Sequence, residues 1–134
     1  MTVYLELADY LLIAEAVLGV PAELIADFNR IGLADSALAA PRAGFGGVEA
    51  YPDFETKAAV LCWHLVKNHP LPDGNKRAAW AALVMFVDLD DGAWAPEPPA
   101  VDEAEAAMIA IASHQVDEAW AASWLRQRVR FTDP

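Results

Sequence analysis

The chain has little of what builds a protein held together by disulfides or structural zinc. Its 134 residues include one cysteine and three histidines. A lone Cys62 excludes an internal disulfide, and its apolar neighbours predict a buried thiol. His64, His69 and His114 do not show the spacing of zinc ligands. A chain of this length buries about two thirds of its unfolded surface without such staples, so we expect a single domain over residues 1–134.

Basic residues are also scarce. Nine Lys and Arg stand against 20 Asp and Glu, the net charge is −11, and no Lys or Arg occurs from Ala78 to Leu125. Such a chain does not attract a nucleic-acid backbone, so we expect no direct DNA binding. The apolar run Ala78–Val87 is far shorter than the ~20 residues that cross a bilayer. The N-terminus lacks a basic stretch followed by an apolar one. We therefore expect a cytoplasmic protein that does not enter a membrane.

Apolar residues recur at helical spacing through most of the chain, which predicts an all-α bundle of about six helices. The helices are expected near residues 4–18, 21–32, 54–68, 75–90, 101–113 and from 116 onward, with a short helix at 35–40. Residues 93–100 hold three prolines and are expected to form a loop.

Some local predictions depend on single residues. Gly32 is expected to end the second helix, and Leu24 is expected to face the core. Asp53 can cap the helix that follows it. Asp102 and Glu105 resemble a capping box for the helix near residue 101.

Residues 42–52 differ in character from the helical segments. Three glycines accompany Phe45, Val48 and Tyr51 in this stretch. The composition is typical of an extended, mobile flap or a short hairpin. An ordinary connector held by two aromatic side chains is equally compatible with it.

The stretch His69–Arg77 contains a base, a carboxylate, a glycine, an amide and two adjacent cations. Two prolines and an Asp-Gly pair predict a loop, and the apolar run after it predicts a buried helix that starts near Asn75. The N-terminus of a helix exposes free N–H groups and the positive end of the helix dipole. The stretch is therefore a natural anion site.

Each side chain of this stretch has a chemical use. His69 can act as a general base toward a hydroxyl group, although a lone histidine is more often structural. Asp73 is a hard oxygen ligand for Mg²⁺, or alternatively a helix cap. Phosphate contacts are expected from the four residues that follow, Gly74, Asn75, Lys76 and Arg77. Together they predict phosphoryl or nucleotidyl transfer to a hydroxyl group. The spacing of a Walker P-loop is absent.

The same nine residues resemble the signature of the Fic/Doc family, roughly His-x-Phe-x-Asp/Asn-Gly/Ala-Asn-Gly/Lys-Arg. Residues 35–38 and 45–52 also resemble segments of its Doc (death-on-curing) branch, so the likeness covers about residues 35–91. Two residues depart from the pattern. Leu71 replaces a phenylalanine that packs in the core, for which we expect a modest packing cost. Pro72 is a second proline in the loop.

The resemblance implies an all-α Fic/Doc fold, a flap that positions the target, and ATP- and Mg²⁺-dependent modification of a protein hydroxyl group. It implies His69 as the base, Asp73 as the Mg²⁺ ligand, and phosphate binding by the residues after Asp73. It also implies a toxin that a small antitoxin protein neutralises.

The resemblance also bears on which group is transferred. In the family branch that transfers AMP, glycine stands where this chain has Lys76, and arginine stands where it has Trp80. Lysine at this position resembles the Doc branch, which implies transfer of the γ-phosphate to elongation factor Tu and a block of translation. AMP transfer and a catalytically silent binding module remain as alternatives.

Overall fold

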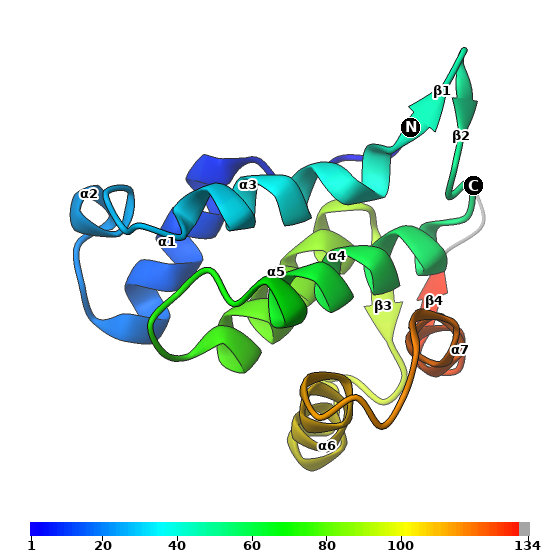
Figure 1. Cartoon of the computed structure of the whole chain (residues 1–134). Helices are drawn as coiled ribbons and strands as arrows, with labels where there is room; N and C mark the ends of the chain where they lie inside the picture. Colours follow the sequence, from blue (N-terminus) through cyan, green and yellow to red (C-terminus); the bar gives the residue numbers. More distant parts are fainter. Residues whose placement is uncertain (132–134) are drawn as a thin grey trace.

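The computed structural model describes residues 1–131, and seven α-helices make up most of that part of the chain (Figure 1). The all-α prediction is thereby confirmed. The helices are α1 Leu7–Leu18, α2 Ala22–Ile25, α3 Ile31–Ala39, α4 Phe54–Asn68, α5 Asn75–Leu89, α6 Val101–Ala112 and α7 Glu118–Arg126. A short 3₁₀ helix, η1 Ala40–Arg42, continues α3.

Two small antiparallel strand pairs complete the fold. β1 Gly44–Phe45 pairs with β2 Val48–Glu49 as a hairpin, and β3 Gly92–Trp94 pairs with β4 Val129–Phe131. The hairpin extends beyond the N-terminal end of α4 (Figure 1). None of the described helices is both long and apolar enough to cross a membrane.

Helix α4 lies at the centre of the bundle. It packs against α3, α5, α6 and α7, and Figure 1 shows α1 to α3 on one side of it and α6 and α7 on the other. Its apolar side chains Ala58, Leu61 and Leu65 recur at helical spacing and are buried. Cys62 is buried beside Met108, and burial raises the pKa of its thiol to about 12. The thiol is therefore a core group, as expected.

The predicted second helix is wrong in its extent. α2 ends at Ile25, and the chain then forms tight turns in which the N–H of Phe28 donates to Ile25 and that of Ile31 donates to Phe28. These bonds reach back three residues, so Ile25, Phe28 and Ile31 face the core with a period of three rather than 3.6. Gly32 lies inside α3, and Leu24 is 57% exposed.

Two predictions near the C-terminal half are also wrong. The loop expected at residues 93–100 begins with strand residues, because Gly92–Trp94 pairs with a segment more than 30 residues further along the chain. Asp102 and Glu105 do not form a capping box, since α6 is capped at Ala100 without a side-chain hydrogen bond. Asp102 lies in the first turn, where a carboxylate still favours the helix dipole.

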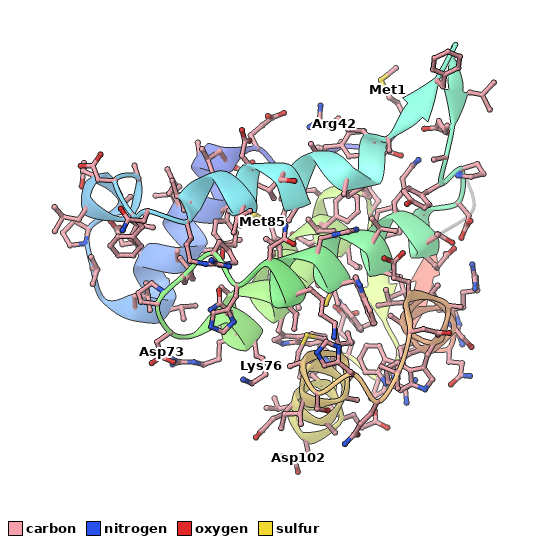
Figure 2. The ribbon with its side chains drawn as sticks, in the orientation of Figure 1. Met1, Arg42, Asp73, Lys76, Met85 and Asp102 are labelled. Carbon is pink, nitrogen blue, oxygen red and sulfur yellow. The ribbon has the colours of Figure 1, made fainter. Side chains whose placement is uncertain are left out.

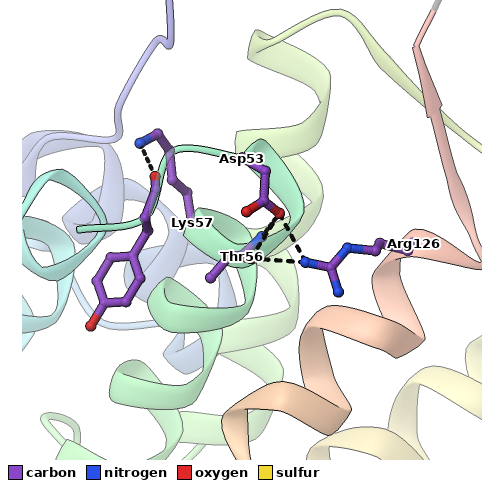
Figure 3. A network of polar contacts seen from close by, with 5 residues as sticks. Asp53, Thr56, Lys57 and Arg126 are labelled. Atoms are coloured by element: carbon purple, nitrogen blue, oxygen red, sulfur yellow. Dashed lines mark hydrogen bonds and ion pairs between the residues drawn. The ribbon is translucent and has the colours of Figure 1, made fainter. Parts of the chain in front are cut away.

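The N-terminus of α4 is bonded to α7 through the predicted cap residue (Figure 3). One carboxylate oxygen of Asp53 accepts from the backbone N–H of Thr56 at 3.1 Å and from its hydroxyl at 2.7 Å. Arg126 of α7 donates to the same carboxylate and to the Thr56 hydroxyl, both at 3.0 Å. Burial alone would raise the pKa of Asp53, but the hydrogen bonds from Thr56 and Arg126 and the charge of Arg126 together lower it.

We predict that Asp53→Ala lowers the free energy of unfolding at neutral pH by about 1–2 kcal/mol, because it removes a helix cap and an exposed ion pair. Asp53→Asn, which keeps a capping oxygen, is expected to cost less. The pKa of Asp53 is lowered in the folded state, so its charge stabilises the fold above the ordinary value of 3.8 and stops doing so as the pH falls through the folded pKa. Denaturant unfolding of wild type and Asp53→Asn should therefore converge at low pH. A constant difference down to pH 2 would contradict this account.

Candidate functional site

The predicted loop lies between the two central helices. α4 ends at Asn68, and α5 begins at Asn75 as expected. His69 follows α4 in the left-handed backbone region, with φ of 53°, and its side chain is exposed. A left-handed backbone is uncommon for a residue other than glycine, and such strain gathers at functional sites. The turn sends the chain away from the axis of α4 and into the loop.

The loop is closed by one side-chain amide. Asn75 accepts a hydrogen bond from the backbone N–H of Leu71 at 2.9 Å and donates one to the carbonyl of Leu71 at 2.8 Å. Both residues are buried, with exposed fractions of 5% for Asn75 and 1% for Leu71. Leu71 thus packs in the core. The amide of Asn75 is engaged inside the protein, so its expected contact with phosphate stays a prediction that this geometry does not favour.

A cation from another part of the chain binds the end of α4. Arg30 donates from Nε to the carbonyl of His69 at 3.0 Å and from Nη2 to the carbonyl of Asn68 at 2.8 Å. A cation at the C-terminus of a helix satisfies free carbonyls and complements the helix dipole. Arg30 therefore holds the backbone of the predicted base. Nothing in the local sequence pattern indicated this residue.

Gly74 is the residue from which α5 starts. Its φ is +74°, and a Cβ placed on it would lie 2.8 Å from Cγ1 of Val17 in α1. Only glycine suits both the left-handed backbone and this close approach. The N–H of Gly74 donates to Oδ1 of Asp73 at 2.8 Å. Asp73 does not cap α5, so the alternative role considered for it is not observed.

The charged side chains of the loop point to solvent. Asp73 and Lys76 extend outward from the same end of the molecule (Figure 2). Asp73 and Arg77 are 86% and 66% exposed, and their closest oxygen and nitrogen are 4.0 Å apart. A surface pair of this kind contributes little, so both groups are available to a ligand. The first backbone bond of α5 runs from the N–H of Ala78 to the carbonyl of Gly74, so the N–H groups of residues 75–77 precede the ladder.

The residues present suit a magnesium ion held together with phosphates. Within residues 1–131, no group of three or more Asp, Glu, His or Cys side chains comes together as a metal cage. Asp73 supplies one exposed carboxylate. Mg²⁺ is commonly bound by one or two carboxylates with phosphate oxygens and water. The donor set therefore fits a nucleotide-bound Mg²⁺.

The segment predicted as a flap or hairpin is a hairpin. Phe45 and Val48 are 92% and 72% exposed, so Phe45 does not hold the segment to the core. Its base is held by Lys57 of α4, which is 1% exposed. The ammonium of Lys57 donates to the Glu49 carboxylate at 2.9 Å. It also donates to the carbonyl of Tyr51, and Figure 3 shows this second bond. A buried ammonium needs these partners, so the base of the hairpin is fixed while its tip is exposed.

Comparisons with known proteins identify the family of the chain. The sequence model of the Fic/DOC family matches residues 4–87, which is more than half of the chain. A protein of Mycolicibacterium smegmatis named Toxin Doc is 41% identical over 118 residues, covering 87% of this chain and 86% of its own length. The chain therefore belongs to the Fic/DOC family. No solved structure matched it.

We predict that Asn75→Ala lowers the free energy of unfolding by about 2–3 kcal/mol, because it leaves a buried N–H and a buried carbonyl of Leu71 without partners. Asn68→Ala is the control, since Asn68 makes one exposed bond to the carbonyl of Leu33 at 3.0 Å. Denaturant titration compares the two variants. Unchanged stability in Asn75→Ala, with weaker nucleotide binding alone, would show that Asn75 acts only as a phosphate ligand.

Gly74→Ala is expected to destabilise the protein by about 1–3 kcal/mol, because a left-handed backbone and the contact with Val17 both oppose a side chain. Gly32→Ala is the matched control. A Cβ at Gly32 meets no atom of residues 1–131 within 4 Å and the residue is helical, so a gain of about 0.5 kcal/mol is expected. Equal melting temperatures for the two variants would contradict the assigned role of Gly74.

Proposed function

We propose that this protein is a Doc-type toxin that transfers the γ-phosphate of ATP to a hydroxyl group of a target protein. One observation carries the proposal. The loop and first turn that lead into the free N–H groups of α5 carry His69, Asp73, Lys76 and Arg77, and hydrogen bonds with Arg30 and Asn75 hold the loop backbone. The named relative supports the toxin class. Elongation factor Tu is the expected target, and arrest of translation the expected effect.

The loop binds the phosphates of the nucleotide. The N–H groups of residues 75–77 and the positive end of the α5 dipole attract an anion. Lys76 and Arg77 add two charges on the same helical turn, and Gly74 lets the backbone approach an oxygen closely. Mg²⁺ held by Asp73 and phosphate oxygens would neutralise charge on the transferred group. Asn75 keeps the loop closed.

His69 is the base in the proposed reaction. Its imidazole removes the proton from the target hydroxyl group as that oxygen forms a bond to the γ-phosphorus. The bond from this phosphorus to the bridging oxygen of the β-phosphate breaks, and ADP leaves with the electron pair. Arg30 acts as a positioning residue, because it binds the carbonyl of His69 and so fixes the backbone that carries the base. The β1–β2 hairpin offers exposed strand edges to the target segment.

AMP transfer is the second candidate, since the same loop can hold an α-phosphate. Lys76 favours phosphate transfer, because a lysine side chain fills space that glycine leaves open. A silent binding module is the third candidate. A small antitoxin protein is expected as a partner in each case.

The test uses the purified chain, free of antitoxin, with elongation factor Tu and a cell lysate, and ATP labelled at the γ- or the α-phosphate. We expect label from the γ-position only, and complete loss of transfer in His69→Ala. His64→Ala is the control, because His64 lies in the adjoining helix α4 and its Nε2 is 3.7 Å from a carboxylate oxygen of Glu118, outside the loop. Label from the α-position would identify an AMP transferase. No label from either position, with folded protein, would favour the binding module.

A further inference from the structure

The β1–β2 hairpin adds nothing to the core of the protein. Every residue from 42 to 50 is exposed, including the apolar pair Phe45 and Val48, which lie opposite each other in the two strands. A two-stranded hairpin is at best marginally stable in water without further contacts. The position of this hairpin is therefore set where its base meets the helical bundle.

The hairpin itself forms one compact unit. Gly46 and Gly47 have φ of 59° and 82°, which suits the tight two-residue turn that joins the strands. Below the strands, the N–H of Ala50 donates to the carbonyl of Ala43 at 2.9 Å. Because the turn and the ladder hold the two strands together, a change at the base turns the hairpin as a whole.

Lys57 connects this base to the bundle. Among the hydrogen bonds of residues 1–131, those of Lys57 are the only ones that run from a helix side chain to residues 44–51. They reach the carboxylate of Glu49 on β2 and the carbonyl of Tyr51, and Figure 3 shows the second of them. The direction of the hairpin thus depends on one ammonium group.

The burial of Lys57 is costly in itself. Its side chain is 2% exposed, whereas that of its partner Glu49 is 54% exposed. An ammonium loses its water on burial, and an apolar side chain of similar length would fill the same space without this cost. Neither partner of Lys57 belongs to α4. The specific effect of the ammonium is therefore to hold the hairpin and not to stabilise its own helix.

We propose that Lys57 is a positioning residue for the protein substrate. By fixing the base of the hairpin, it holds the strand edges in the direction in which a target segment meets them. The target then binds without first ordering the hairpin, which lowers the cost of association. This inference rests on the proposed function, in which the hairpin contacts the target, and it adds the residue that prepares this contact.

The experiment measures the steady-state rate of phosphate transfer by the whole chain over a range of target concentrations. The target is the protein that the labelling test identifies, with elongation factor Tu expected. Lys57→Met should raise the KM for this protein at least about tenfold, since ordering the backbone of even one residue costs the equivalent of a tenfold change in affinity. The kcat and the KM for ATP should stay as in wild type, because the loop is unchanged.

Arg126→Met is the matched control. Arg126 is also a cation at the N-terminal end of α4, but it donates to Asp53 and Thr56 of the helix cap and not to the hairpin (Figure 3). Its loss should leave the KM for the target unchanged. A rise equal to that of Lys57→Met would show that any lost cation at this end has the same effect, and would overturn the specific role of Lys57.

Glu49 provides a test that leaves the core intact, because its side chain is exposed. Glu49→Ala should raise the KM for the target, and Glu49→Gln should raise it less, because an amide oxygen still accepts from the ammonium. In the Lys57→Met background, Glu49→Ala should add nothing further, since both changes remove the same contact. Independent, additive effects would mean that Glu49 acts on the target directly, and would overturn the proposed pairing.

Hydrogen exchange reports on the hairpin without any reaction. Lys57→Met should speed exchange at the N–H of Ala50 and leave that of the buried middle of α4 slow. Unchanged exchange at Ala50 overturns the inference. So does an active wild type whose KM for the target is the same in Lys57→Met, and this outcome leaves the proposed function standing. A wild type that transfers phosphate to no protein overturns the proposed function and the positioning role with it.

Discussion

The double hydrogen bond between the Asn75 side chain and the backbone of Leu71 is the constraint on which the site depends. It closes residues 71–75 into a ring with 2.9 and 2.8 Å bonds, and both partners are buried. Because water is excluded there, an alternative loop conformation would leave polar groups unpaired at a cost of several kcal/mol. The exposed side chains of Asp73, Lys76 and Arg77 therefore project from a rigid base. Preorganisation of this kind lowers the cost of binding a ligand.

The rest of the fold holds this ring from outside. Arg30 donates hydrogen bonds to the carbonyls of Asn68 and His69 at the end of α4. Val17 of α1 packs so close to Gly74 that no side chain fits there, and the side chain of Leu71 is buried in the core. The hairpin is held in a comparable way, since the buried ammonium of Lys57 finds its carboxylate on β2. Both ends of α4 thus carry a loop whose backbone is fixed and whose outer side chains are free. This division is compatible with the proposed function, in which the loop binds a nucleotide and the hairpin contacts a second protein.

Much of this was predictable, for local reasons. The α4–α5 loop and the start of α5 follow from prolines, an Asp-Gly pair and ten apolar residues, and the Asp53 cap follows from residue type. The errors have two different reasons, one local and one long-range. Leu24 and Gly32 were misplaced because a spacing of three residues, as between Ile25, Phe28 and Ile31, is compatible with both an α-helix and a series of tight turns when only a few residues are considered. The β3–β4 pair was missed because its two strands are joined by no short turn.

The sequence by itself determined the helical class, the family signature and the chemical types gathered between His69 and Arg77, because these depend on residues close together in the chain. Tertiary structure alone decided what surrounds them. In the folded chain the Asn75 amide is buried against the backbone of Leu71, and Arg30 binds the carbonyl of His69. Lys57 binds Glu49 at the base of the hairpin, and a groove lies between α5 and α6 beside Trp80. The physical reason is the distance along the chain over which each interaction acts. Turn and helix preferences act within a few residues, whereas burial and the pairing of charges join segments that only the packed chain brings together.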